Sequence, residues 1–183
     1  MIRTSMRACA QITAFAAAML VAGSAAATTK DEYRAAKNRI GTEYKAAKAK
    51  CDALTAQPKN LCVAEAKAAD KRAKARAEAD YENTPKAREK AVIADAEATY
   101  MVAKEQCSTK TGNDKDVCVK AAKAAETKVK ADAKAARQTT VAKADAKDTK
   151  RDADYKVARE KCDPLTGAAK DKCVADAKAK YSN

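Results

Sequence analysis

The stretch YKAAKAKCDALTAQPKNLCVAEAKA, residues 44–68, decides the fold, because it recurs twice more without a gap. Residues 100–124 read YMVAKEQCSTKTGNDKDVCVKAAKA, and residues 155–179 read YKVAREKCDPLTGAAKDKCVADAKA. Each copy holds Tyr, Cys, Thr, Lys and Cys in the same register, so one unit of structure is expected three times. Besides the cysteines, the repeat-defining residues are Tyr44, Tyr100, Tyr155, Thr55, Thr111 and Thr166.

Both arms of the repeat have helical periodicity. Before the first Cys, steps of four and three residues lead through Ile40, Tyr44 and Ala47 to Cys51, which is the pattern of a helix facing one partner. After Cys62 the seam continues in alanine, the residue with the best helix propensity. Small side chains allow two helices to approach closely, so each unit is expected to be a tight antiparallel pair.

Between the two cysteines of each copy lies a turn. The helix stop and start signals in these turns are Pro58 in the first copy, Gly112 in the second, and Pro164 with Gly167 in the third. A reversal there brings the two cysteines face to face. A bridge that closes so short a loop is worth roughly 3 kcal/mol, a large contribution for an alanine seam. The predicted disulfides are Cys51–Cys62, Cys107–Cys118 and Cys162–Cys173.

Two other roles for these cysteines stay open. Thiol redox catalysis is one, although that chemistry favours a Cys-x-x-Cys pair with a depressed pKa. Thiolate metal binding is the other, although each hairpin offers only two ligands. The tyrosines also have two interpretations: packing beside the bridges, or an exposed recognition ring.

The first 27 residues have the features of a secretory signal. Arg3 and Arg7 form a basic start, residues 12–22 are apolar, and three alanines end at Ala27. Cleavage there would leave a chain that starts where a repeat starts and has no later segment apolar enough to span a membrane. The predicted organisation is a signal peptide at 1–27 and hairpin repeats at 28–83, 84–138 and 139–183, the third one truncated.

The predicted fold class is all-α: three tandem disulfide-stapled antiparallel helical hairpins that form an elongated bundle or a coiled-coil-like rod. Asn83, Thr84 and Pro85 should separate the first two units, because Pro suits the first turn of a helix. The equivalent residues Gln138, Thr139 and Thr140 are only weak helix formers. Residues from about 114 to 161 are therefore expected to form one helix, ~70 Å long.

The sequence lacks the residues of common catalytic sites. It contains no histidine, which excludes Ser-His-Asp and Cys-His nucleophiles and any histidine metal site. Its four glycines are scattered, so there is no phosphate-binding loop. Carboxylate pairs such as Asp152 and Asp154 are two residues apart and point to different helix faces. We therefore predict a protein that is not an enzyme, with no cofactor and no metal site.

The chain carries a net charge of +13, or about +11 without Arg3 and Arg7. The excess is dispersed over the repeats, which favours solubility and loose attraction to polyanions. Basic residues outnumber acids on the second helices, where they form either a solvated face or a polyanion contact surface. These residues are Lys67, Lys71, Arg72, Lys74, Arg76, Lys120, Lys123, Lys128, Lys130, Lys134 and Arg137.

The charged alanine run AEAKAADKRAKARAEAD, residues 64–80, resembles the TolA-like family of Ala/Lys-rich helical cell-envelope proteins. In that family the corresponding region is a periplasmic spacer between a membrane anchor and an interaction domain. The resemblance is one of composition and covers most of the chain after residue 27. It implies a helical envelope protein and carries no site residues.

Three functions follow as hypotheses. The first is a non-enzymatic structural or interaction protein, exported to the bacterial periplasm or cell surface, whose partner is an envelope protein, an anionic polymer or a second copy of itself. The second is a polyanion-binding module for lipopolysaccharide, cell-wall polymer or DNA, whose affinity should fall steeply with salt. The third is a Cys-based redox or metal-handling protein.

Overall fold

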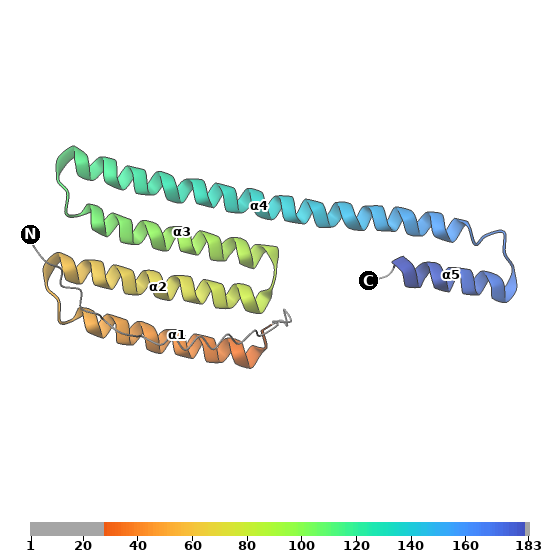
Figure 1. Ribbon diagram of the computed structural model, residues 1–183, viewed down its shortest axis with the longest axis horizontal. Coiled ribbons are helices and arrows are strands. Elements are labelled where there is room, and N and C mark those ends of the chain that lie inside the picture. Colours follow the sequence, from red (N-terminus) through yellow and green to blue (C-terminus); the bar gives the residue numbers. More distant parts are fainter. Residues whose placement is uncertain (1–27, 182–183) are drawn as a thin grey trace, which may run out of the picture.

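Five helices account for nearly all of residues 28–181, the part of the chain that the computed structural model describes (Figure 1). No strand occurs in this part, and the predicted all-α class is confirmed. The predicted signal peptide lies outside the described residues. The helices are α1 (Lys30–Cys51), α2 (Ala56–Glu82), α3 (Pro85–Cys107), α4 (Gly112–Glu160) and α5 (Gly167–Tyr181).

Local signals set the helix ends. α1 begins with a capping box in which the Thr29 hydroxyl accepts from the Glu32 N–H and the Glu32 carboxylate accepts from the Thr29 N–H. α2 ends where Asn83 adopts a left-handed conformation, and α3 begins at Pro85. The Thr84 hydroxyl caps α3 by accepting from the Ala87 N–H at 3.0 Å. The break expected after the first repeat is therefore present.

α4 is a single helix of 49 residues. It runs from Gly112 to Glu160, within two residues of the bounds expected from the sequence. The helix continues without a break through Gln138, Thr139 and Thr140. This segment has no counterpart of the left-handed Asn83 that ends α2 or of the proline that starts α3. The boundary expected between the second and third repeats thus falls within a continuous helix.

The helices form a single open layer. Within residues 28–181, only helices that follow one another in the chain are in contact; α2 with α3 is the most extensive pairing and α4 with α5 the least. Figure 1 shows α1 to α4 side by side, with the second half of α4 extending beyond the other three. α5 folds back along that extension, on the same side of α4 as α3.

The core consists almost entirely of alanine and half of each disulfide. Ile40 is the one buried large aliphatic side chain in the described chain, while Cys51, Cys107 and Cys162 are almost completely inaccessible. In α2 and α3, buried alanines occupy two opposite sides, because each of these helices lies between two neighbours. The sequence pattern predicted one seam per helix, and the second seam was missed. No helix of residues 28–181 has the length and apolarity needed to span a membrane.

Candidate functional site

The three disulfides join the pairs that the spacing predicts: Cys51–Cys62, Cys107–Cys118 and Cys162–Cys173. Each bridge ties the end of one helix to the start of the next, and the first cysteine of each pair is buried. All six cysteines of residues 28–181 are therefore in bridges. In the same residues, no group of three or more His, Cys, Asp or Glu side chains is placed to hold a metal ion.

The repeat threonines mark helix starts. Thr55 and Thr111 are the N-cap residues of α2 and α4, although their side chains make no capping hydrogen bond, and Thr166 directly precedes α5. The residue after each threonine has a left-handed backbone, with φ of 51° at Ala56, 53° at Gly112 and 55° at Gly167. All three turns thus share a threonine followed by a residue with positive φ.

The repeat tyrosines are all half-buried. The ring of Tyr100 lies beneath the Lys123 ammonium, 4.9 Å from its centroid, and the ring of Tyr155 lies 6.4 Å from that of Tyr181. Both contacts join the two helices of a hairpin several residues from its bridge. A second aromatic contact, Tyr33 stacked on Tyr81 at 4.7 Å, closes the far end of the α1–α2 hairpin.

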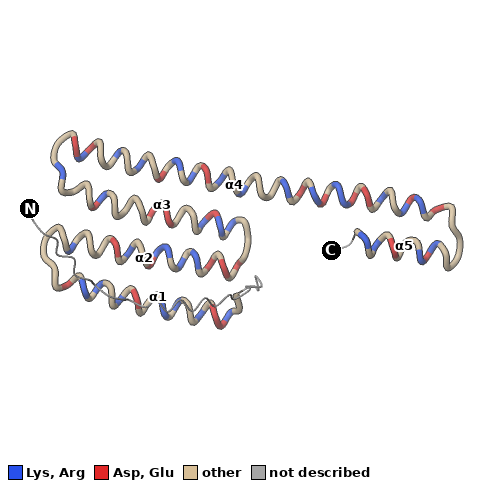
Figure 2. The backbone as a smooth tube through the Cα atoms, in the orientation of Figure 1, with Lys and Arg blue, Asp and Glu red and all other residues tan. Residues whose placement is uncertain are grey.

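Most of the predicted basic stripe is neutralised internally. Seven of its eleven residues contact carboxylates, whereas Lys67, Lys120, Lys128 and Lys134 have no acidic partner within residues 28–181. Figure 2 shows acidic and basic residues interspersed along all five helices. The ion-paired members are Lys71, Arg72, Lys74, Arg76, Lys123, Lys130 and Arg137.

Three of these cations and two carboxylates form a chain of charges across the layer. Lys71 on α2 contacts Glu97 on α3, and the other Glu97 oxygen accepts from Lys130 on α4 at 2.7 Å. Lys130 also contacts Glu126 at 2.7 Å, and Glu126 contacts Lys123 at 2.8 Å. The Glu126 side chain is only 3% exposed. Three helices are thereby connected through two carboxylates that each contact two ammonium groups.

The alternation of ammonium and carboxylate groups shifts the pKa values of three members of this charge chain. Hydrogen bonds from Lys130 and then Lys71 hold the pKa of Glu97 below its ordinary value. Those from Lys123 and then Lys130 do the same for the pKa of Glu126. The pKa of Lys130 is raised, mainly by its hydrogen bonds to Glu126 and Glu97. All three groups therefore stay charged over a wider pH range than they would in isolation.

The charge chain borders a cavity on one face of the layer, with a volume of about 750 Å³. We call it the lysine groove. It lies over α3 between α2 and α4, and Val63, Tyr100 and Met101 supply its apolar lining. Two of its cations, Lys67 and Lys104, have no acidic partner among the described residues. The other charged residues that line it are Lys59, Lys123, Lys130, Glu97, Glu105 and Glu126.

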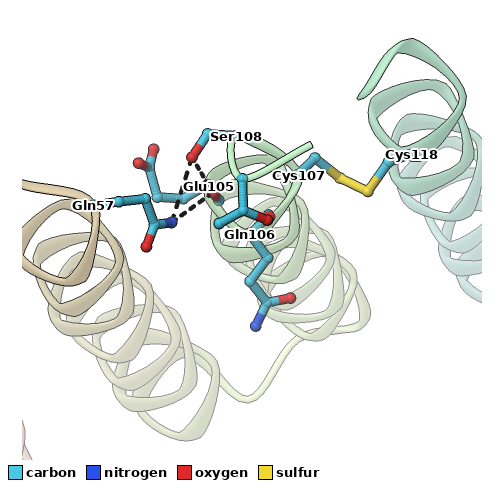
Figure 3. The surroundings of a disulfide bond; sticks show 7 residues. Gln57, Glu105, Gln106, Cys107, Ser108 and Cys118 are labelled. Atoms are coloured by element: carbon cyan, nitrogen blue, oxygen red, sulfur yellow. Dashed lines mark hydrogen bonds between the residues drawn. A yellow bond between two sulfur atoms is a disulfide. The ribbon is translucent and has the colours of Figure 1, made fainter. Parts of the chain in front are cut away.

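One side-chain contact connects the first hairpin to the bridge of the second. Gln57, near the start of α2, donates from Nε2 to the Glu105 carbonyl at 3.1 Å and to the Ser108 hydroxyl at 3.4 Å (Figure 3). Glu105 and Ser108 flank Cys107, so this contact anchors the start of α2 beside the Cys107–Cys118 bridge. The end of the lysine groove near Glu105 is fixed in this way.

The sequence did not reveal every residue of the groove. Lys67, Lys123 and Lys130 belong to the predicted basic stripe, and the structure brings them together with Lys104 and Glu97, which were not singled out. The missed signal is the alternation of alanine with charge, as in AEAKA at 64–68 and ADAEA at 94–98. It places alanine on both packed sides of a helix and charge on its open faces.

Chemically, the groove offers ammonium groups around an apolar floor, an arrangement suited to binding an anion. In comparisons with protein families, curated proteins and solved structures, none matches this chain.

Proposed function

We propose that this chain is an exported, non-enzymatic structural or interaction protein of the bacterial cell envelope, built as three tandem stapled hairpins in an elongated rod. The observation that carries the proposal is the open layer: within residues 28–181, helices contact only their neighbours in the chain, so both broad faces of the layer remain available to a partner. Repeat arrays with such faces commonly serve as binding surfaces.

Two features support export to the envelope. Disulfides persist in oxidising compartments, and three bridges hold a core that contains little besides alanine. Residues 1–27 have the composition of a signal peptide, and the charged alanine helices resemble those of TolA-like envelope proteins. A bacterial periplasm would supply both the oxidising conditions and the site of action.

The test of export is to express the full chain in a bacterium with an oxidising periplasm and to determine its intact mass. We expect a periplasmic protein that starts at Thr28 and has six hydrogens fewer than the reduced chain, one pair for each bridge. A variant without residues 1–27 is the control and should stay in the cytosol with free thiols. Recovery of the full chain with uncleaved residues 1–27 and free thiols would contradict the proposal.

A second candidate, polyanion binding, is favoured by the lysine groove. Lys67 and Lys104 lack acidic partners there, and the five cations of the lining exceed its three carboxylates. A phosphorylated or carboxylated polymer, such as lipopolysaccharide, fits this chemistry. Its binding would place anionic groups between the two free ammonium groups.

The test of this second candidate is the salt dependence of lipopolysaccharide binding by a Lys67→Gln/Lys104→Gln variant. Loss of two contacts should lower the slope of log affinity against log salt by roughly 2. The matched control is Lys45→Gln/Lys48→Gln, which removes the same charge from two exposed α1 positions outside the groove. Equal slopes for the two variants would exclude the groove as the binding site.

A further inference from the structure

One side of α4 is bare along the whole helix. α3 and α5 both lie on the opposite side of α4 (Figure 1). On that side Ala133 is buried and lines a cavity with Glu89 of α3, and Tyr155 is half-buried beside Tyr181 of α5. The bare side carries an apolar strip whose two ends, Val117 and Val157, are 56% and 57% exposed. We call it the outer strip. Its residues recur at helical spacing and are all exposed: Val117, Ala121, Ala124, Ala131, Ala135, Ala142, Ala146, Ala153 and Val157.

The first half of the outer strip has a packed counterpart in α2. Cys118 is the repeat equivalent of Cys62, and in that register Ala124, Ala131 and Ala135 correspond to Ala68, Ala75 and Ala79. Those three α2 residues form its seam against α3. Ala68 is completely buried, and Ala68 and Ala75 lie one helical turn to either side of Arg72, whose ion-pair partner Asp95 is on α3.

The second half has a packed counterpart in α3. In the register that aligns Cys162 with Cys107, Ala142, Ala146 and Ala153 correspond to Ala87, Ala91 and Ala98. Those three residues lie on the side of α3 that faces α2, because Ala91 and Ala98 lie one helical turn to either side of Asp95, the ion-pair partner of Arg72 on α2. Ala98 is completely buried and Ala87 is 1% exposed. The outer strip thus contains both halves of the α2–α3 interface, one after the other on a single helix.

The two halves cannot meet within one straight helix. α2 and α3 pair because the chain reverses at Asn83, Thr84 and Pro85, whereas the equivalent Gln138, Thr139 and Thr140 continue as helix. A second α4 that lies antiparallel to the first brings each half against its complement. Such a pair contains the α2–α3 type of contact twice, and that contact is the most extensive one between helices of residues 28–181.

We propose that two copies of this chain form a dimer through their outer strips, with the α4 helices antiparallel and the two-fold axis near Thr139 and Thr140. The partner is a second copy of this chain. The proposal does not depend on export or on any ligand. It explains why an interface that is filled between α2 and α3 is left open on α4.

The charges beside the strip fit this register. The ion pairs Arg76–Asp95 and Glu78–Lys90 of the α2–α3 interface correspond to Asp132 with Lys150, and Lys134 with Asp145, across the two copies. Both pairs have reversed signs and remain complementary. Within residues 28–181 none of these four α4 residues has an ion-pair partner, so each is available to the second copy.

A third position completes the pattern. Arg72, which contacts Asp95 and Thr99, corresponds to Lys128, and the equivalents of its two partners are Lys150 and Asp154. Lys150 is a like charge, but Asp132 faces it, while Asp154 offers Lys128 a carboxylate. The register therefore supplies a carboxylate for each of three lysines that lack one in the single chain.

The first test compares two alanines within residues 141–150, a segment of α4 whose residues are all exposed. The two alanines are two residues apart and lie on opposite sides of the helix. Ala146→Glu places a charge in the outer strip, and Ala144→Glu makes the same change on the other side; both positions are exposed in the single chain. By sedimentation of the oxidised protein, we expect the wild type to be a dimer. Ala146→Glu should raise the dissociation constant at least about tenfold and Ala144→Glu should leave it unchanged.

The second test checks the register. Asp132→Lys should weaken the dimer by juxtaposing two lysines, and adding Lys150→Asp in the same chain should restore it. Residues 132 and 150 are separated by about 27 Å along one helix, so a rescue can only arise between copies. A wild type that stays monomeric up to about 100 µM, or equal effects of Ala144→Glu and Ala146→Glu, would overturn the proposal. So would a double variant no tighter than Asp132→Lys.

Discussion

Three equivalent residues share a left-handed backbone and differ in side chain. Ala56, Gly112 and Gly167 follow the repeat threonines with φ between 51° and 55°. A Cβ at Gly112 or Gly167 would meet nothing within 4 Å, so the difference between alanine and glycine here is one of backbone conformation alone. The left-handed region costs an L-residue about 1 kcal/mol or more, and glycine avoids that cost.

We therefore predict that Ala56→Gly raises the free energy of unfolding by about 1 kcal/mol and that Gly112→Ala lowers it by a similar amount. Urea denaturation followed by circular dichroism measures both. Gly41→Ala is the control: Gly41 lies inside α1 without a positive φ and also has open space around its Cβ position. It should be stabilising by about 0.5–1 kcal/mol, so Gly→Ala substitutions at 41 and 112 should have opposite signs.

The buried carboxylate of Glu126 predicts sensitivity to acid. Its pKa is below the ordinary value of 4.5, chiefly through the hydrogen bond from Lys123. The stability that it contributes is complete above pH 4.5 and is lost as the pH falls through the lowered pKa. Glu126→Gln should lower the free energy of unfolding by about 1–2 kcal/mol at pH 7, because two charged hydrogen bonds weaken. The loss is no larger because both lysine side chains are partly in solvent.

The measurement is the free energy of unfolding between pH 7 and pH 2, for wild type and variant. The gap between them should narrow at acid pH, since protonation also neutralises Glu126 in the wild type. Glu160→Gln is the control, because Glu160 is exposed and has no ion-pair partner among residues 28–181. A constant gap from pH 7 to pH 2 would show that the Glu126 charge does not stabilise the fold.

At the scale of the helix, alanine on two sides explains both what the sequence predicted and what it missed. The seam through Cys62 and Ala66 was readable because cysteine marks it, and the helices and turns follow from the repeat. The opposite seam of α2, through Ala64 and Ala68, contains neither cysteine nor aromatic residues. Alanine is common on exposed helix faces as well, so composition does not distinguish a packed side from a solvated one.

The same reasoning applies to the lysine groove. Several of its cations belong to the basic stripe listed from the sequence, but a carboxylate that neutralises Lys130 comes from a different helix, since Glu97 is on α3. Which helices are neighbours depends on the second seams. The groove could therefore not be predicted before those seams were known.

α5 should depend on its bridge more than any other helix. Among the described helices it contacts α4 alone, and that pairing is the least extensive of the four. We predict that Cys162→Ser/Cys173→Ser unfolds most of the 15 residues of α5 while α1 to α4 persist. The bridge contributes roughly 3 kcal/mol, which is more than a helix with little besides Ala177 buried can replace.

Hydrogen exchange measured by mass spectrometry tests this prediction. Amides of residues 167–181 should exchange rapidly in the variant, and those of α2 and α3 should stay protected. Cys107→Ser/Cys118→Ser is the matched control, because Arg137–Glu89 at 2.6 Å and Lys130–Glu97 at 2.7 Å still connect α3 to α4. Retained protection of α5 without its bridge would show that packing alone suffices.

At the scale of the whole molecule, one turn decides the shape. The first two repeats fold against each other at Asn83, Thr84 and Pro85, whereas the third continues along α4 and leaves the layer (Figure 1). The aligned residues Gln138, Thr139 and Thr140 differ from the turn at two positions only. The alanine seams on either side of residues 138–140 correspond to those of α2 and α3. The absence of a turn at residues 138–140 therefore accounts for the extended shape of the molecule.

We predict that Gln138→Asn/Thr140→Pro, which copies Asn83-Thr84-Pro85, breaks α4 and folds the third hairpin back along the second. Asparagine would supply the left-handed end of the first helix, and proline, which is unfavourable in a helix interior by about 3 kcal/mol, would start the next. The two halves of the outer strip would then pack within one chain. Small-angle scattering should show a smaller radius of gyration with nearly unchanged helix content.

The control is Gln138→Asn alone, which keeps α4 continuous and should leave the radius of gyration unchanged. The double variant should also sediment as a monomer at concentrations where the wild type is a dimer, since its outer strip is covered from within. A double variant that stays as extended as the wild type would mean that the α4 seams do not attract each other as those of α2 and α3 do. Its scattering would then be that of a kinked rod, and the repeat alone would not determine how helices pair in this molecule.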